Sequence, residues 1–216
     1  MNVNVIKVTF EDLKTSARFS EKLRGFLGNK YKGNTLLHNH CGKQYIYRYP
    51  LVQYKVIRKT PMIIGINEAI EDVFNIGKND DEFLIDGKEN ITYRKKIIKE
   101  EVEFGCYDDY INYKFLTPWI ALNQKKVLEY EKSNLLEKEE ILKKVLIGNL
   151  ISMSKGLNYT VDKQIKCWIN LSEKEVMLKG IKHIAFVGEF KTNFIIPDYL
   201  GIGKSVSRGF GTVEKQ

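Results

Sequence analysis

Residues 3–10, with the sequence VNVIKVTF, alternate apolar and polar side chains in the way a half-buried β-strand does. Residues 11–27 then place apolar side chains at helical spacing and stop at Gly28, a residue type that commonly ends helices. We therefore predict that the chain opens with a strand followed directly by a helix.

Four further elements are predicted in the first half of the chain. Residues 35–58 hold two β-rich runs with a turn signal at residues 41–43 and with Pro50, which ends a strand or kinks an edge, so we expect a hairpin. Residues 61–74 are typical of a short helix, and residues 91–104 alternate as a strand does. The resulting order of strand, helix, two strands, helix and strand is that of the ferredoxin-like fold. The predicted class is α+β.

The second half of the chain again mixes helices and strands, in shorter and less regular form. We predict that Thr117-Pro118-Trp119 opens a helical stretch, that residues 134–154 form a long amphipathic helix, and that strands follow at 163–171 and 183–194. No low-complexity linker separates the halves, so we expect two domains packed directly together. The predicted domains are residues 1–108 and 109–216.

The composition is that of a globular protein. The chain has 216 residues, 43% of them hydrophobic, enough for one large domain or two small ones. No signal-peptide pattern opens the sequence and no apolar run is long enough to span a bilayer, so we expect a cytoplasmic protein. Cys41, Cys106 and Cys167 form no C-x-x-C pair and are expected to be free thiols.

The positive charge is concentrated near the N-terminus. The whole chain carries a net charge of +8, whereas residues 1–60, with twelve Lys or Arg and three acids, carry +9. Residues 45–49, YIYRY, interleave tyrosines with an arginine. Phosphates attract basic side chains and nucleobases stack on aromatic rings, so this segment suits RNA. A solvated basic face above core tyrosines is the alternative interpretation.

Residues 201–211, GIGKSVSRGFG, contain four glycines, two basic residues and two serines. Glycines permit positive φ and leave backbone N–H groups open to a ligand, so we predict an anion-binding loop to which Lys204 and Arg208 add charge. A tight turn at a domain end is the alternative. The candidate RNA-binding residues of this segment are Gly201, Gly203, Lys204, Ser205, Arg208, Gly209 and Gly211.

Known nucleotide-binding motifs do not account for this segment. Gly203-Lys204-Ser205 matches the end of a P-loop, but Asp198 occupies the position of the first P-loop glycine, and too few residues follow for the helix of that motif. Val206 occupies the third glycine position of a dinucleotide-binding pattern. We therefore expect no nucleotide cofactor.

His38 and His40 are two of the three histidines, and we place both on a predicted strand just before the hairpin turn. Residues two apart on a strand point to the same face. Two imidazoles in a basic surrounding suit metal-free RNA cleavage, in which a base takes the 2′-OH proton and an acid protonates the departing 5′-oxygen. Lys30, Lys32 and Tyr47 are nearby in the sequence and would stabilise charge on the phosphate.

Other interpretations of the histidines have less support. A zinc site needs a further Cys or acidic ligand, and an HNH-type nuclease unit needs a third ligand at helical spacing, and the sequence offers neither. A structural role for a strand histidine is the plainest alternative. His183, which stands alone before an apolar run, is predicted to be structural.

Two segments carry a family resemblance. The glycine-rich ending, residues 199–213, resembles the glycine-rich loop of CRISPR-associated repeat-cutting endoribonucleases, the Cas six family. Residues 47–55, YRYPLVQYK, preceded by His38-Asn39-His40, are similar to the N-terminal domain of its b-type members. The resemblance covers nearly the whole chain, including residues 117–119 and 188–197.

The resemblance implies tandem ferredoxin-like (RAMP-type) domains, the second less regular, and metal-independent cutting of CRISPR precursor RNA within its repeats. The products would carry a 5′-hydroxyl and a 2′,3′-cyclic phosphate. The catalytic role falls on His40 or His38, with Tyr47 and Lys30 as helpers. RNA would be held by the glycine-rich segment and, in the basic segment, by Lys32 and Arg48.

The resemblance also implies partners. These are CRISPR repeat RNA, a second copy of the chain in a homodimer, and other CRISPR-associated proteins. The alternative function is a non-catalytic RNA-binding subunit of a CRISPR effector complex, which would not need His38 and His40.

Overall fold

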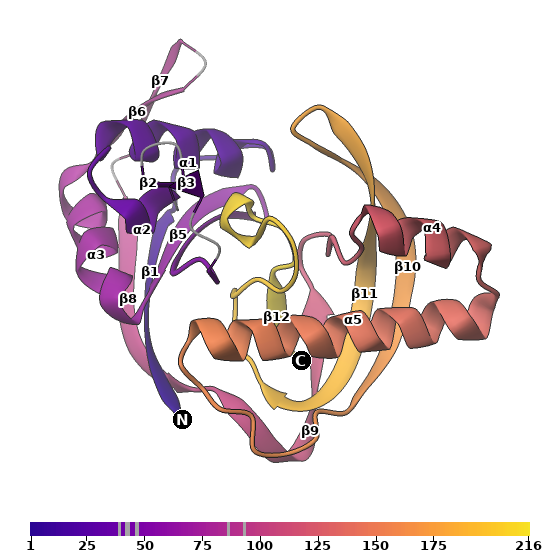
Figure 1. Cartoon of the computed structure of the whole chain (residues 1–216). Coiled ribbons are helices and arrows are strands. Elements are labelled where there is room, and N and C mark those ends of the chain that lie inside the picture. The colour runs from indigo at the N-terminus through magenta and orange to yellow at the C-terminus, as the bar shows by residue number, and fades with distance from the viewer. Residues whose placement is uncertain (39, 42–43, 46–47, 86, 93) are drawn as a thin grey trace. The chain divides into compact units, whose positions relative to one another are not determined.

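The computed structural model describes residues 1–38, 40, 41, 44, 45, 48–85, 87–92 and 94–216, and for residues 38, 40, 41, 44 and 45 it describes the backbone only. The chain forms two compact units (Figure 1). The N-terminal unit comprises residues 2–102 and 207–209, and the C-terminal unit comprises Met1 and residues 103–206 and 210–216. The glycine-rich segment therefore contributes residues to both units.

A four-stranded sheet in the order β4-β5-β1-β8 forms the N-terminal unit. Its strands are β1 (Asn2–Phe10), β4 (Val52–Ile57), β5 (Thr60–Ile66) and β8 (Lys95–Glu103). β5 pairs antiparallel with both β1 and β4, so that Val5 lies opposite Ile66 and Val52 lies opposite Gly65. This strand order confirms the predicted ferredoxin-like arrangement.

Two helices pack against this sheet (Figure 1), namely α1 (Phe19–Lys30) and α3 (Ile70–Asn79), the second preceded by the 3₁₀ turn η1 (Asn67–Ala69). Glycines bring α3 close to the sheet. A Cβ atom on Gly77 of α3 would lie 2.8 Å from Val8, and one on Gly65 of β5 would lie 2.8 Å from Val73. The apolar core of this unit lies between the helices and the sheet.

The hairpin of this sheet lies later in the chain than predicted. β4 and β5 form it, and the chain turns at Arg58 and Lys59, whose φ angles are +50° and +66°. Positive φ at two successive residues suits a tight hairpin turn, but these residues carry none of the usual Gly or Asn signal. The predicted turn falls in a separate short hairpin of β2 (His40–Cys41) and β3 (Gln44–Tyr45), and its residues Gly42 and Lys43 lie outside the described residues.

The predicted helix over residues 61–74 is wrong in its first half. Residues 61–66 belong to β5, and the helix begins only at Ile70. The β-branched side chains of Ile63, Ile64 and Ile66 are buried, and such side chains favour a packed strand over a helix.

The first helix is also shorter than predicted. It begins at Phe19 because the backbone before it bonds elsewhere, with the N–H of Glu11 donating to the Arg94 carbonyl at 2.9 Å and that of Thr15 donating to the Lys59 carbonyl at 2.8 Å. Near the end of the unit, a small hairpin of β6 (Glu82–Ile85) and β7 (Lys88–Ile91) precedes β8.

The C-terminal unit repeats the same strand order. Its sheet runs β10-β11-β9-β12, and the strands are β9 (Gly105–Phe115), β10 (Cys167–Leu178), β11 (Ile181–Ile195) and β12 (Val213–Lys215). Taken in chain order, the strands are arranged as second, third, first and fourth, as in the N-terminal unit. The tandem ferredoxin-like prediction is confirmed.

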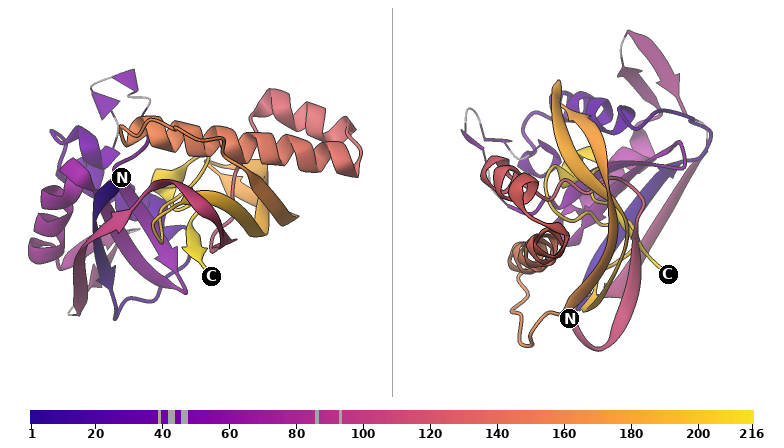
Figure 2. Two further views of the ribbon diagram at one scale, coloured as in Figure 1. Left: turned by 90° about the horizontal axis from the view of Figure 1, so that it is seen from below. Right: turned by 90° about the vertical axis from the view of Figure 1, so that its right-hand side faces the viewer.

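Helices cover one face of this second sheet (Figures 1 and 2), and they are α4 (Gln124–Lys132) and α5 (Leu135–Gly156). Asn134 begins α5 with a capping box, in which its side chain accepts from the Glu137 N–H and the Glu137 carboxylate accepts from the Asn134 N–H. The crossover from β11 to β12 contains no α-helix. The glycine-rich segment, with the 3₁₀ turn η2 (Val206–Arg208), takes its place, which explains why the second domain is less regular.

Two predictions for this half need correction. Residues 117–119 do not open a helix, because Trp119 exchanges backbone hydrogen bonds of 2.8 and 2.9 Å with Phe186 of β11, and α4 begins only at Gln124. The predicted strands 163–171 and 183–194 overlap β10, which begins only at Cys167, and β11. These two strands form one long hairpin that turns at Lys179 and Gly180, both with positive φ.

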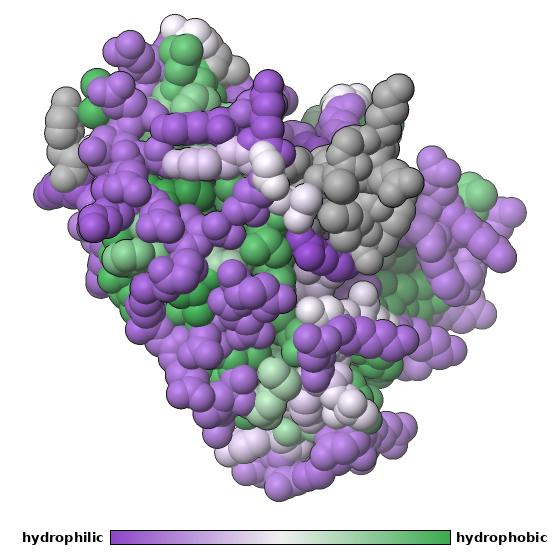
Figure 3. Space-filling view, turned by 60° about the vertical axis from the view of Figure 1, so that its left-hand side comes forward, coloured by the Kyte–Doolittle hydropathy of each residue, from purple (hydrophilic) through white to green (hydrophobic). Residues whose placement is uncertain are grey.

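The face shown in Figure 3 is mostly hydrophilic and is broken only by small apolar patches. None of the helices in the described part of the chain is both long and apolar enough to cross a bilayer.

Candidate functional site

The two candidate catalytic histidines lie on different elements. His38 is the last residue of the short helix α2 (Thr35–His38), and His40 begins β2, where it pairs with Tyr45. The expectation that both lie on one strand and share a face is therefore wrong. Asn34 explains the helix, because its side-chain oxygen accepts the Leu36 N–H at 3.0 Å and so caps the helix start. The side chains of His38 and His40, and all of Tyr47, lie outside the described residues.

The backbone that carries the histidines is anchored to the N-terminal sheet. The hydroxyl of Tyr54 on β4 donates to the Leu37 carbonyl at 3.2 Å, next to His38, and the Leu37 side chain is buried. Burial raises the pKa of the Tyr54 phenol, so it stays a protonated donor. Arg48 Nη2 donates to the Thr35 carbonyl at 3.2 Å, which ties residue 48 to α2. Tyr54 was not among the predicted site residues.

Lys30, a predicted catalytic helper, ends α1 in a polar cluster. Its Nζ lies 2.5 Å from Oδ1 of Asp80, and the hydroxyl of Tyr31 donates to Oδ2 of Asp80 at 2.7 Å. The Asp80 side chain is 2% exposed, whereas that of Lys30 is 44% exposed. Burial and the Asp80 carboxylate raise the pKa of Tyr31 to about 12. This cluster holds the end of α1, from which the chain runs toward α2.

We expect Lys30 to stabilise the fold, in addition to the role predicted for it in cleavage. Lys30→Met should lower the free energy of unfolding by about 1–3 kcal/mol, because it removes the charged partner of a buried carboxylate. Urea denaturation should show that Lys30→Met combined with Asp80→Asn costs less than the two single changes summed. Lys32→Met, in the exposed turn after α1, is the control and should change little. Additive losses would argue against the Lys30–Asp80 pair.

The glycines of the glycine-rich segment pack against the chain itself. Gly203, Gly209 and Gly211 have φ of +89°, +93° and +63°. A Cβ on Gly203 would lie 2.5 Å from Trp119 Nε1, and one on Gly211 would overlap the Ile202 carbonyl oxygen. The segment closes on itself through a bridge between Gly201 and Thr212. Packing within the chain therefore accounts for these glycines without a bound RNA.

The two cations of this segment differ in their surroundings. Arg208 is half-buried, forms an ion pair with Glu21 of α1, and accepts the Ser20 hydroxyl on its backbone carbonyl at 2.8 Å. Burial lowers the pKa of the Arg208 guanidinium. Lys204 is exposed and forms no ion pair with any residue the structure describes. Next to it, Ser205 is half-buried with φ of +60°.

The two remaining RNA-binding candidates lie in the basic segment of the N-terminal unit. Lys32 is exposed in the turn that follows α1, and Arg48 is exposed beside α2.

His183 is partly buried on β11, where burial and the charge of Lys204 lower the pKa of its imidazole. The sequence did not indicate that Lys204 lies near His183.

Lys55 is a titratable group that sequence reasoning passed over. It lies on β4 with a side chain that is fully buried, and burial lowers its pKa to about 7. Because its side chain has no exposed surface, Lys55 is not a candidate for contact with substrate. The sequence did not reveal this burial. Residues 51–56, LVQYKV, have the pattern of an alternating strand with one polar face, whereas in the structure every side chain of this run is buried.

Lys55 should make stability depend on pH. Its folded pKa of about 7 lies below its ordinary value of 10.5, so between these values the unfolded chain binds more protons and stability rises with pH. The rise should reach about 1.4 kcal/mol per pH unit. Lys55→Met should remove this contribution, so that the difference in free energy of unfolding between variant and wild type shrinks or reverses from pH 7 to pH 10. Parallel pH curves for the two proteins would contradict this assignment.

Comparison with known proteins agrees with this architecture at two levels. A RAMP protein that binds different RNA substrates is 14% identical and superposes with a TM-score of 0.60, which is a likeness of fold alone. An uncharacterized protein of Methanocaldococcus jannaschii is 51% identical over 112 residues, which are 51% of this chain and 76% of that protein.

The closer agreement is with one family. A crystal structure of Cas6b is 40% identical over the whole of both chains, with a TM-score of 0.95, and a crystal structure of the CRISPR RNA processing endoribonuclease Cas6b is 38% identical over the same extent, with a TM-score of 0.81. Residues 1–103 match the Cas6b N-terminal domain and residues 105–216 match the Cas6b C-terminal domain. Since these two matches leave out only residue 104, the chain belongs to the Cas6b family.

Proposed function

We propose that this chain is a CRISPR RNA processing endoribonuclease that cuts precursor RNA within its repeats. The observation that carries the proposal is the pair His38 and His40, two positions apart in a basic segment of a Cas6b chain, with the backbone beside His38 anchored by Tyr54. A full-length relative at 38% identity is a CRISPR RNA processing endoribonuclease.

The proposed chemistry is an internal transfer at the RNA phosphate. One imidazole takes the proton of the 2′-OH, the 2′-oxygen bonds to phosphorus, and the bond to the 5′-oxygen breaks as the other imidazole donates a proton to it. The products carry a 2′,3′-cyclic phosphate and a 5′-hydroxyl. Because the nucleophile is supplied by the RNA and both proton transfers by histidines, the proposed reaction is metal-independent. Lys30 and Tyr47 are proposed to stabilise the phosphate charge.

RNA binding is divided between the two domains, which we take as residues 1–108 and 109–216. Lys32 and Arg48 offer exposed charge in the first, and Lys204 does so in the second, next to the half-buried hydroxyl of Ser205. Arg208 and the positive-φ glycines shape the loop that presents Lys204. A homodimer and complexes with other CRISPR-associated proteins are proposed as further partners.

The test is cleavage of end-labelled CRISPR repeat RNA in excess EDTA, beside the same RNA with a 2′-deoxy group at the cut position. Cutting at a single site that survives the chelator and stops with the 2′-deoxy RNA supports the proposal, because the 2′-OH is the nucleophile. Tight binding of intact repeat RNA without cutting would instead support the second candidate, a non-catalytic RNA-binding subunit.

A further inference from the structure

An exposed aromatic pair lies on the open face of the C-terminal sheet. Trp168 of β10 is paired in register with Lys191 of β11, and Lys191 is paired with Asn112 of β9. Tyr110 lies two residues before Asn112 on β9 and so points to the same face. The rings of Tyr110 and Trp168 have centroids 4.7 Å apart and are nearly perpendicular, at 85°. The Nζ of Lys191 lies 5.6 Å from the centroid of the Tyr110 ring.

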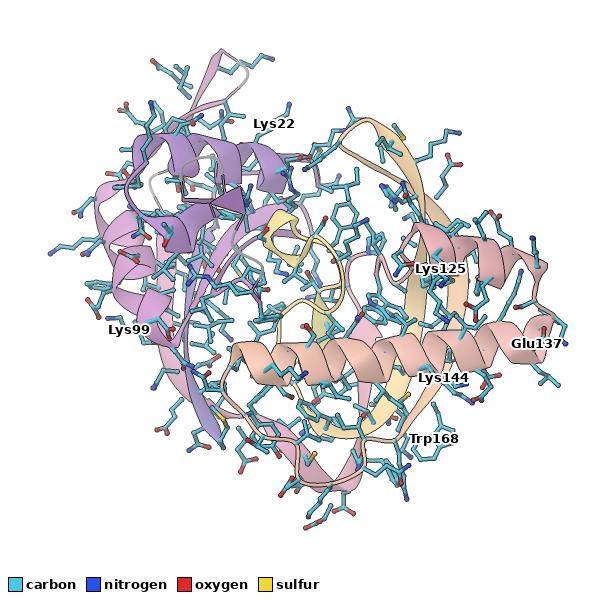
Figure 4. The ribbon with its side chains drawn as sticks, in the orientation of Figure 1. Lys22, Lys99, Lys125, Glu137, Lys144 and Trp168 are labelled. Carbon is cyan, nitrogen blue, oxygen red and sulfur yellow. The ribbon has the colours of Figure 1, made fainter. Side chains whose placement is uncertain are left out.

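This face is turned away from the helices. Cys167, the neighbour of Trp168, points its Sγ toward the Lys143 carbonyl of α5 at 3.6 Å, so Trp168 must point the opposite way. Trp168 is 48% exposed and Tyr110 is 41% exposed. Figure 4 shows Trp168 projecting outward from the ribbon of β10.

The core of the unit does not need these two rings. The aromatic core lies on the helix-covered side, where Phe190 stacks on Tyr113 and contacts Phe115, all three of them buried. Neither Tyr110 nor Trp168 is among the residues predicted from the sequence to bind or cut RNA. Two large exposed rings in contact with each other offer a surface on which a flat ligand stacks.

The charges around the pair favour an anionic partner. Of the nearby carboxylates, Asp108 pairs with Lys163 and Glu189, on the same face as Lys191, pairs with Lys114. Asp162 accepts the Tyr159 hydroxyl and keeps its charge. Lys166, just before β10, and Lys191 have no ion-pair partner in the part of the chain that the structure describes. Asp109 is a further exposed acid beside them. Two lysines without an ion-pair partner among the described residues, beside two exposed rings, match a phosphate backbone with unstacked bases.

We propose that Tyr110, Trp168 and Lys191 form a second RNA site that binds unpaired RNA by base stacking. A base stacks on the exposed ring surface while Lys191 and Lys166 attract the adjoining phosphates. The RNA-recognition motif, which is a four-stranded sheet, stacks RNA bases on aromatic side chains of its sheet in this manner. The choice of RNA as the ligand rests on the proposed function, and the site deepens it by giving the transcript a contact that contains no candidate catalytic residue.

The test uses the intrinsic fluorescence of the whole chain. The chain has two tryptophans, of which Trp119 is fully buried, so a stacked base should quench mainly Trp168. The probe is an oligouridylate of about ten nucleotides, a length within the range of such sites. We expect saturable quenching that is absent in Trp168→Phe, and binding of labelled probe that is weakened roughly tenfold to a hundredfold in Trp168→Ala and in Tyr110→Ala.

Matched controls separate stacking from charge and from the cleavage activity. Met177→Ala removes an equally exposed apolar side chain from the same strand and should leave binding unchanged. An RNA duplex of the same length should bind more weakly, because its bases are already stacked. Equal binding by wild type and both alanine variants would overturn the proposal, as would self-association through Trp168 without RNA binding. Cleavage of repeat RNA is measured separately. If the protein cleaves RNA but its fluorescence is not quenched, only the second RNA site is contradicted. If the fluorescence is quenched but RNA is not cleaved, only the proposed function is contradicted.

Discussion

A His40→Ala variant should cut CRISPR repeat RNA at least about 100-fold more slowly than the wild-type chain while binding it with similar affinity. General acid–base catalysis contributes about 10²–10⁴-fold to such reactions, and an alanine can neither take nor give a proton. His38→Ala should act in the same direction. Single-turnover cleavage with excess protein measures the effect on chemistry without a contribution from product release.

The pH dependence of this rate tests the pairing of the two histidines. An acid and a base acting together give a bell-shaped profile, and removal of either should abolish one of its two limbs. His183→Ala is the matched control, since it removes the third histidine from the other unit and should keep both limbs. A full bell-shaped profile and wild-type rate in both His38→Ala and His40→Ala would show that neither histidine is catalytic.

The fold was predictable where the local pattern was strong. The alternation of residues 3–10 and the amphipathic run over residues 134–154 identified β1 and α5, and the ferredoxin-like order followed from the sequence of elements. The β4–β5 turn at Arg58 and Lys59 was missed because neither residue is typical of positive φ. Here long-range pairing of the two strands, and not local preference, determines where the chain turns.

The site was predictable in composition but not in geometry. Placing His38 and His40 on one strand relied on the β-rich residues around them. The helix at residues 35–38 depends on the Asn34 cap and on the Tyr54 hydroxyl, which reaches the Leu37 carbonyl from β4. A contact between residues 17 positions apart leaves no local signal in the sequence.

The charged candidates show the same limit. Lys30 was chosen as a catalytic helper and Arg208 as a cation for RNA, yet the structure pairs Lys30 with Asp80 and Arg208 with Glu21. Each partner is distant in the chain, so the sequence could not show that these cations are already engaged. Lys204 is the candidate of the glycine-rich segment whose exposed charge agrees with the prediction.

Gly211→Ala should lower the free energy of unfolding by about 3 kcal/mol or more, one of the largest effects expected of any single substitution in this chain. The φ of +63° at Gly211 is costly for any residue with a Cβ, and that Cβ would overlap the carbonyl oxygen of Ile202. This clash is with rigid backbone, since the Ile202 N–H is hydrogen-bonded to the Gly211 carbonyl at 2.9 Å. Urea denaturation of the full chain measures the loss.

Gly148→Ala is the matched control and should have the opposite sign. Gly148 lies in the middle of α5, where a Cβ would meet no atom within 4 Å, so alanine should stabilise the helix by about 0.5–1 kcal/mol. Comparing the stability and the RNA affinity of these variants also shows whether Gly211 serves the closure of the loop or the close approach of RNA. If Gly211→Ala unfolds readily, this glycine serves the closure of the loop. If instead it keeps wild-type stability and loses RNA affinity, the absence of a side chain serves close approach of RNA, as the sequence alone suggested.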